Sequence, residues 1–354
     1  MMMNKRLIGT VKESKKYIAG NVFFQWVSLC ANIVMMAAIA LLLQGLYHGA
    51  AGHGETAMTA AIGVAAVAVR YACTVASSRM RFLSSKAVKK TLREMICGKL
   101  LRLGSAYREQ VNTSEVVQIA VEGVEQLETY FGAYLPQFFY AMLAPLTLFA
   151  VLSFVNLPSA AVLLVCVPLI PVTIVVIQRW AKKLLNRYWG QYTALGDTFL
   201  ENLQGLTTTK IYQADEMKHR EMNEQSEHFR KITMKVLTMQ LNSITVMDVI
   251  AYGGAALGVI LATTQLRAGR VDLAGSLLII LLAADFFLPM RMLGSYFHIA
   301  MNGMAASDKI FRLLDLPEPE QKQREVPADC TIACKNLHFA YEPEREILHG
   351  VDMR

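Results

Sequence analysis

Six long apolar stretches, separated by gaps that alternate between very short and very long, most constrain how this chain folds. Each stretch can cross a hydrocarbon core about 30 Å thick, which takes about 20 helical residues. Backbone groups inside a bilayer must be hydrogen-bonded within the protein, so each stretch is expected to be an α-helix. The sequence predicts an all-α polytopic membrane protein with spans at about 17–47, 56–76, 129–154, 160–177, 244–264 and 273–288. The last span reaches the required length only if its helix continues past Pro289.

The composition supports a membrane protein over a nucleic-acid-binding one. Hydrophobic residues make up 54% of the chain and charged residues 18%, whereas soluble domains carry about 25% charged residues. The net charge is +7, but the basic residues lie next to the apolar spans. In that position they report membrane orientation. We therefore expect membrane lipid, and no nucleic acid, as a partner.

The distribution of Lys and Arg predicts which side of the membrane each gap occupies. The long gaps 79–128 and 179–243 are rich in both, whereas the short gaps 45–55 and 155–159 contain neither. Basic residues accumulate on the cytoplasmic side. The N-terminus and the long gaps are therefore predicted to be cytoplasmic. The outer loop 265–272 is an exception, because it contains Arg267 and Arg270.

The long gaps keep the apolar spacing of helices, so we expect the spanning helices to continue into the cytoplasm. Two breaks in this pattern, at 104–112 and 200–215, mark the turns farthest from the membrane. Thr113 or Ser114 is expected to be a helix N-cap after the first break.

The end of the chain changes character. A helical domain is predicted over 1–315, followed by a Pro-rich charged linker over 316–328. From 329 to 354 the pattern predicts a short β segment, with strands at 331–339 and 347–353 and a turn at 342–345.

This organisation resembles the transmembrane domain of an ABC exporter, with the type I exporter fold. The segments AYREQVNTSEVVQI at 106–119 and ENLQGLTTTKIY at 201–212 resemble the family's two coupling helices, which contact nucleotide-binding domains. The last residues resemble the first strands of a nucleotide-binding domain, in which Tyr341 would stack on adenine. The coupling residues implied by the resemblance are Gln110, Asn112, Thr113, Ser114, Glu115, Thr208, Thr209, Lys210, Ile211 and Tyr212.

Within the family, 201–212 and the segment from Phe287 to Phe311 are most similar to CydD-type subunits. That resemblance implies ATP-driven export of a thiol such as cysteine or glutathione, or of haem, in support of cytochrome bd assembly. It also implies a bacterial cytoplasmic membrane, ATP with Mg²⁺ in the intact transporter, and a CydC-like partner in a heterodimer. The alternatives are half of a multidrug or lipid exporter, a channel or receptor, and a motor-less membrane domain that acts only by pairing.

One motif of the family is absent. No G-x-x-x-x-G-K-[ST] loop occurs in the sequence, so nothing in it can cradle the β and γ phosphates of ATP. We assign no catalytic residue and expect this chain alone not to hydrolyse ATP. We expect the sequence to be a truncated product or a part of a longer transporter.

Four ionisable residues lie in or beside apolar spans: Arg70, Asp248, Asp285 and Arg291. Such groups are costly in a bilayer, and they usually face a cavity or one another. One hypothesis is a shared inward-facing cavity for a charged or zwitterionic substrate. The other is structural pairing between helices, of Arg291 with Asp285 or of Arg70 with Asp248.

The remaining reactive residues give weaker signals. The six cysteines form no C-x-x-C pair, and no histidine lies at metal-ligand spacing from them, so no metal site is predicted. His298 could ligate haem, although a lone histidine on a helix is more often a hydrogen-bonded structural residue. Met290 and Met292 beside the sixth span could line an adaptable pocket, although ordinary packing is the simpler interpretation. The prolines of the spans, Pro168 and Pro289 among them, are predicted to kink their helices.

Overall fold

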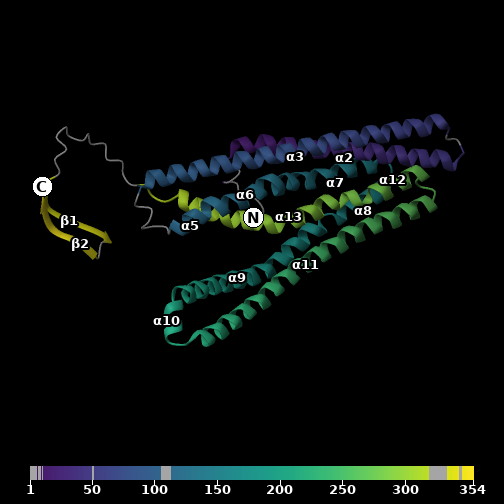
Figure 1. Ribbon diagram of the computed structural model, residues 1–354. Helices are drawn as coiled ribbons and strands as arrows, with labels where there is room; N and C mark the ends of the chain where they lie inside the picture. Colours follow the sequence, from purple (N-terminus) through teal and green to yellow (C-terminus); the bar gives the residue numbers. More distant parts are fainter. Residues whose placement is uncertain are drawn as a thin grey trace.

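The computed structural model describes residues 6, 9, 11–49, 52–104, 113–318, 333–342 and 345–354 (Figure 1). Helices dominate it, and they run roughly along one direction. In chain order the helical elements are α2 (Lys12–Tyr47), α3 (His53–Leu103), α5 (Thr113–Gln118), η2 (Ile119–Gly123), α6 (Val124–Thr129), η3 (Tyr130–Tyr134), α7 (Leu135–Ser153), α8 (Leu157–Cys166), α9 (Leu169–Gln204), α10 (Leu206–Ile211), α11 (Asp215–Arg267), α12 (Leu273–Ala283), η4 (Ala284–Phe286) and α13 (Leu288–Leu314).

The predicted spans correspond to helices. Among the described residues, five helical segments are long and apolar enough to cross a membrane, by length and composition: Glu13–Tyr47, His53–Leu103, Val116–Ser153, Asp215–Arg267 and Leu273–Tyr296. A shorter apolar helix over Leu157–Thr173 contains most of the predicted fourth span. It is interrupted at Pro168, where α8 ends and α9 begins, because proline lacks the N–H that would continue the helix.

The sixth span does continue past Pro289, as its length required, and Leu273–Tyr296 covers 24 residues. It is not a regular helix throughout. The 3₁₀ turn η4 separates α12 from α13, and Pro289 lies in the first turn of α13. In an uninterrupted helix the ring of Pro289 would clash with the carbonyl four residues earlier, which is that of Asp285. The backbone irregularity therefore falls at an ionisable residue.

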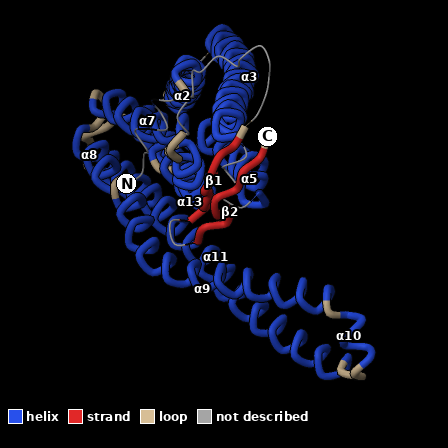
Figure 2. The backbone as a smooth tube through the Cα atoms, turned by 90° about the vertical axis from the view of Figure 1, so that its left-hand side faces the viewer, coloured by secondary structure: helices blue, strands red, loops and turns tan. Residues whose placement is uncertain are grey.

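The long gaps are helical extensions, as predicted. Helix α3 contains 51 residues and α11 contains 53, which gives lengths of about 77 and 80 Å at 1.5 Å per residue. Helices α9 and α11 form a long hairpin that leans away from the other helices, with α10 at its tip (Figure 2). Gly104, at a φ of 59°, ends α3 where the sequence predicted the first break.

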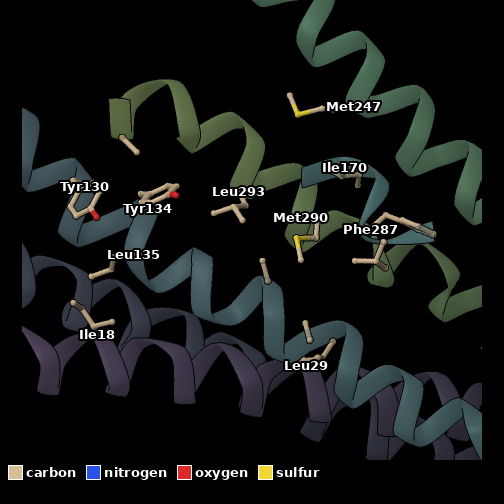
Figure 3. Packing of buried hydrophobic residues seen from close by; sticks show 14 of the residues in the cluster. Ile18, Leu29, Tyr130, Tyr134, Leu135, Ile170, Met247, Phe287, Met290 and Leu293 are labelled. Atoms are coloured by element: carbon tan, nitrogen blue, oxygen red, sulfur yellow. The ribbon is translucent and has the colours of Figure 1, made fainter. Parts of the chain in front are cut away.

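The core of the bundle is built around the third span. The π-helical segment η3 buries Tyr130, Phe131 and Tyr134 almost completely, and the rings of Tyr130 and Tyr134 stack with centroids 5.4 Å apart. Figure 3 shows these rings on one side of the core and Phe287 and Met290 on the other. A π turn inserts an extra residue into the helix, so it changes the direction in which later side chains point.

Small residues let helix α11 approach its neighbours closely. A Cβ at Gly254 would lie 2.4 Å from the ring of Phe287, and a Cβ at Gly258 would lie 2.8 Å from the Leu163 side chain. Close approach at small residues is typical of packing between membrane helices. The contact between Gly254 and Phe287 fixes α11 against the junction of η4 and α13.

The C-terminal residues form a hairpin of two strands. Strand β1 (Cys334–Glu342) pairs with β2 (Arg345–Met353) in an antiparallel sheet, with Phe339 opposite Leu348. Both predicted strands are therefore confirmed within the described residues. The start of the predicted first strand, 331–332, lies outside them.

Candidate functional site

The first polar cluster inside the spans joins three elements through an asparagine. The Asn32 side chain on α2 donates a hydrogen bond from Nδ2 to Asp285 Oδ2 at 2.7 Å. The Arg70 guanidinium on α3 donates to Asn32 Oδ1 at 2.9 Å. Asn32 is 8% exposed, and its amide bridges the positive and the negative group. Because both the oxygen and the nitrogen of the Asn32 amide are hydrogen-bonded, the orientation of the side chain is fixed.

The second polar cluster is a direct ion pair between α11 and α13. Arg291 donates from Nε to Asp248 Oδ1, and a second nitrogen lies 3.3 Å from Oδ2. The side chains of Arg291 and Asp248 are 27% and 30% exposed. Met247 and Met290, their neighbours along the chain, are buried (Figure 3). The charges therefore lie at the edge of the core and remain accessible from one side.

Both clusters lie at similar depths. Asn32, Arg70 and Asp285 are about 18–25 Å from the outer ends of their helices at 1.5 Å per residue. Asp248 and Arg291 are about 28 Å from theirs. The four ionisable residues thus lie in two adjacent layers of the predicted inner half of the bilayer.

The pairings expected from the sequence were wrong. Arg291 pairs with Asp248 rather than with Asp285, and Arg70 reaches Asp285 through Asn32 rather than contacting Asp248. Asp285 lies within the 3₁₀ turn η4, and Arg291 lies in α13. The two residues are six positions apart, which even in a regular helix would place their side chains about 120° apart around the axis. Sequence reasoning missed Asn32, although an amide in the middle of an apolar span is a usable signal.

At the tip of the α9–α11 hairpin, α10 is a short helix over the segment predicted to be the second coupling region. Ile211 and Tyr212 are 72% and 78% exposed. Lys210 Nζ donates to Asp215 Oδ2 at 2.6 Å, and this hydrogen bond lowers the pKa of Asp215. Thr208 accepts, through its carbonyl, the backbone N–H of Tyr212, and Thr209 Oγ1 donates to the Gly205 carbonyl. The tip of the hairpin therefore exposes apolar side chains on a turn that these hydrogen bonds stabilise.

The other predicted contact residues are only partly described. Gln110 and Asn112 lie outside the described residues, and α5 begins at Thr113. The side chains of Thr113, Ser114 and Glu115 are not described. Tyr341 lies in β1, and its side chain is likewise outside the description. The proposed roles of these residues remain predictions.

A third set of contacts, which the sequence did not suggest, ties the end of α13 to α3. Lys99 Nζ, with only 6% of its side chain exposed, donates to the Leu316 carbonyl at 2.6 Å and to Glu318 Oε1 at 2.9 Å. Arg102 donates to the same Glu318 oxygen at 3.0 Å. Hydrogen bonds from these two cations lower the pKa of Glu318. The start of the predicted linker is therefore hydrogen-bonded to α3.

Comparison with known proteins identifies relatives that match most of this chain. The family of ABC transporter transmembrane regions matches residues 18–290. An uncharacterised ABC transporter ATP-binding protein of Haemophilus influenzae is 46% identical over 333 residues, which are 93% of this chain and 60% of that protein.

Two further relatives carry more specific names. The glutathione/L-cysteine transport system ATP-binding/permease protein CydC of Bacillus subtilis is 25% identical over 81% of this chain and 52% of its own length. The corresponding CydD protein of Escherichia coli is 25% identical over 77% and 48%. The chain thus spans about half to three fifths of the length of these curated relatives.

Proposed function

Since the chain belongs to the family of ABC transporter transmembrane regions, we propose that it is the membrane domain of an ATP-driven exporter subunit for a small thiol, cysteine or glutathione. Its place is the bacterial cytoplasmic membrane, which it crosses several times. The names of the CydC and CydD relatives support this class of solute. Haem as the solute, and a role in cytochrome bd assembly, belong to the same proposal.

The observation that carries the proposal is the placement of opposite charges in apolar spans. Cysteine and glutathione carry both carboxylate and ammonium groups at neutral pH. The half-accessible pair of Asp248 and Arg291 offers one partner for each of them, at adjacent positions on α11 and α13. A substrate that satisfied both charges would replace the ion pair without leaving a charge unpaired in the membrane.

The proposed mechanism is alternating access. ATP with Mg²⁺ would close two nucleotide-binding domains, one of them on a CydC-like partner subunit, and Tyr341 would stack on the adenine. The exposed tip at α10 would carry this motion along the α9–α11 hairpin. Because α11 contains Asp248, movement of the hairpin against α13 would change the distance between Asp248 and Arg291. Substrate affinity would thereby depend on the nucleotide state.

The test is ATP-dependent uptake of labelled cysteine and glutathione into everted membrane vesicles that contain the subunit and a CydC-like partner. Asp248→Asn and Arg291→Gln are each expected to lower uptake by at least about tenfold, the effect of losing one charge-assisted hydrogen bond. The charge-swapped double variant, Asp248→Arg with Arg291→Asp, is expected to restore the ion pair and with it any loss of protein from the membrane in the single variants. It is not expected to restore uptake, because the carboxylate and ammonium groups of the substrate would each face a residue of the wrong charge.

The matched control is Glu94→Gln, which removes an exposed carboxylate on α3 that lies 3.9 Å from Lys90. This variant is expected to transport normally, because exposed pairs contribute little. Full recovery of uptake in the charge-swapped variant would show that the pair is structural and would refute its role in substrate binding. Absence of ATP-dependent thiol uptake by the unmodified protein would refute the proposed solute.

A further inference from the structure

A groove between α2 and α3 has the form of a lipid site. It has a volume of about 650 Å³, and its lining includes Phe24, Tyr71, Val75, Leu83 and Arg79. Arg79 is the only charged residue of the lining, and the other lining residues are apolar or aromatic. The Tyr71 and Val75 side chains are 73% and 51% exposed. The groove therefore offers an open apolar surface with one positive charge.

The part of the groove that an acyl chain would cover fits within one leaflet of a bilayer. From Tyr71 to Arg79 the lining extends about 12 Å along α3 at 1.5 Å per residue, and Leu83 lies about 6 Å beyond Arg79. One leaflet contributes half of a hydrocarbon core of about 30 Å. Arg79 is the first basic residue after the predicted second span, so it lies where the predicted inner leaflet meets water. An acyl chain along the groove would place its phosphate beside Arg79.

The walls of the groove are held in place by contacts on the buried side of the same helices. Asn21 Nδ2 donates to the Ser77 carbonyl at 3.1 Å, and Ser77 Oγ donates to Asn21 Oδ1 at 3.1 Å. The hydroxyls of Ser14 and Ser84 lie 2.7 Å apart, about two turns farther along the two helices. Helices α2 and α3 run side by side in both views (Figures 1 and 2). The groove is therefore a fixed feature of the pair.

The positive charge of Arg79 favours a phospholipid over a protein helix in the groove. Within the part of the chain that the structure describes, the Arg79 guanidinium has no hydrogen bond or ion pair to another residue. A helix of a partner subunit that covered the groove would remove this guanidinium from water, which is costly unless an acid pairs with it. A phospholipid brings its own phosphate and leaves Arg79 at the aqueous boundary. Anionic lipids of the cytoplasmic leaflet also attract basic residues near the membrane surface.

We propose that the groove between α2 and α3 binds an anionic phospholipid of the cytoplasmic leaflet, with an acyl chain along Tyr71 and Val75 and the phosphate at Arg79. This site is separate from the charged pairs considered above, because its lining contains none of their residues. It would be occupied whichever solute the protein transports.

The experiment measures the phospholipid that stays bound after extraction from membranes of phosphatidylethanolamine and phosphatidylglycerol, by native mass spectrometry of the complete transporter. The unmodified protein is expected to retain phosphatidylglycerol. Arg79→Gln is expected to retain roughly tenfold less, the effect of losing one charge-assisted contact to phosphate. Arg93→Gln is the matched control, because Arg93 is exposed on α3 about 21 Å farther along the helix; its retention should equal that of the unmodified protein.

A second variant tests the apolar part of the site. Ala76 also lines the groove. Ala76→Trp would fill the groove while leaving Arg79 in place, and it is expected to displace the lipid as well. Equal retention by the Arg79→Gln and Arg93→Gln variants would overturn the proposal. Crosslinking of a Val75→Cys variant to a partner subunit would also overturn it, because a protein helix would then occupy the groove.

Discussion

Replacement of Gly254 by alanine tests whether the contact between α11 and the junction of η4 and α13 is as tight as the geometry indicates. The new Cβ would lie 2.4, 2.6 and 2.9 Å from three ring atoms of Phe287. Non-bonded carbon atoms prefer a separation of about 3.5–4.0 Å. The ring is completely buried, so it cannot swing into solvent to make room. Either α11 or the start of α13 must move.

The magnitude follows from two opposing effects. Overpacking a core by one methyl group costs about 1–3 kcal/mol. Alanine also has a helix propensity about 0.8–1.0 kcal/mol better than that of glycine. Gly253 provides the matched control, because a Cβ at that position would meet nothing within 4 Å. The propensity gain is common to both variants, so the difference between them, about 1–3 kcal/mol, measures the overpacking alone.

The assay is thermal unfolding of the detergent-solubilised protein, followed by the fraction that stays monodisperse in size-exclusion chromatography. Gly254→Ala is expected to melt a few degrees below Gly253→Ala, since 1 kcal/mol shifts the midpoint by roughly 2–4 °C in a chain of moderate size. Phe287→Leu is expected to cost less in the Gly254→Ala background than alone, because it vacates the space that the new methyl group needs. Equal midpoints for the two alanine variants would refute the reasoning.

Three further predictions concern other elements. Lys99→Met should lower the unfolding free energy by about 1–3 kcal/mol, because it leaves the Leu316 carbonyl without its donor; Arg102→Met, at a more exposed position, should cost less in the same melting assay. Asn156→Ala should cost about 1 kcal/mol, because the Asn156 side chain caps α8 by accepting the Ser159 N–H at 2.9 Å, and helix content against temperature measures it. The hydrogen bond from Lys210 lowers the pKa of Asp215 in the folded protein, so the stability it contributes is complete above the unfolded value of about 3.9 and is lost as the pH falls through the lower folded value. Pepsin cleavage near α10 should therefore accelerate slightly more between about pH 4.5 and about pH 3 in the unmodified protein than in Asp215→Asn, which lacks the pair at both pH values; the difference is small because both side chains are exposed.

Most of the fold could be predicted because it depends on properties that are local in sequence. A membrane span requires an unbroken apolar helix, so hydropathy alone placed the spans. Proline and glycine marked breaks for equally local reasons, as at Pro168, Pro289 and Gly104. The short helix α10 and the C-terminal hairpin also lie where the change of pattern predicted them.

The candidate site was only half predictable. The four ionisable residues could be recognised, because charges are rare in apolar spans. Their partners could not be, because pairing depends on how helices rotate and cross. Asn32, Arg70 and Asp285 lie on three different elements, and Asp248 and Arg291 lie on two, so their contacts depend on how these elements pack.

The sequence by itself therefore determined which segments cross the membrane, where the helices turn, and which charges the bilayer must accommodate. Only the tertiary structure decided that Asp248 pairs with Arg291, that Asn32 joins Arg70 to Asp285, and that Lys99 holds the end of α13. The physical reason is the range of the interactions. Burial of an apolar helix in lipid is a property of each segment alone, whereas a hydrogen bond requires two atoms from distant segments to meet within about 3 Å.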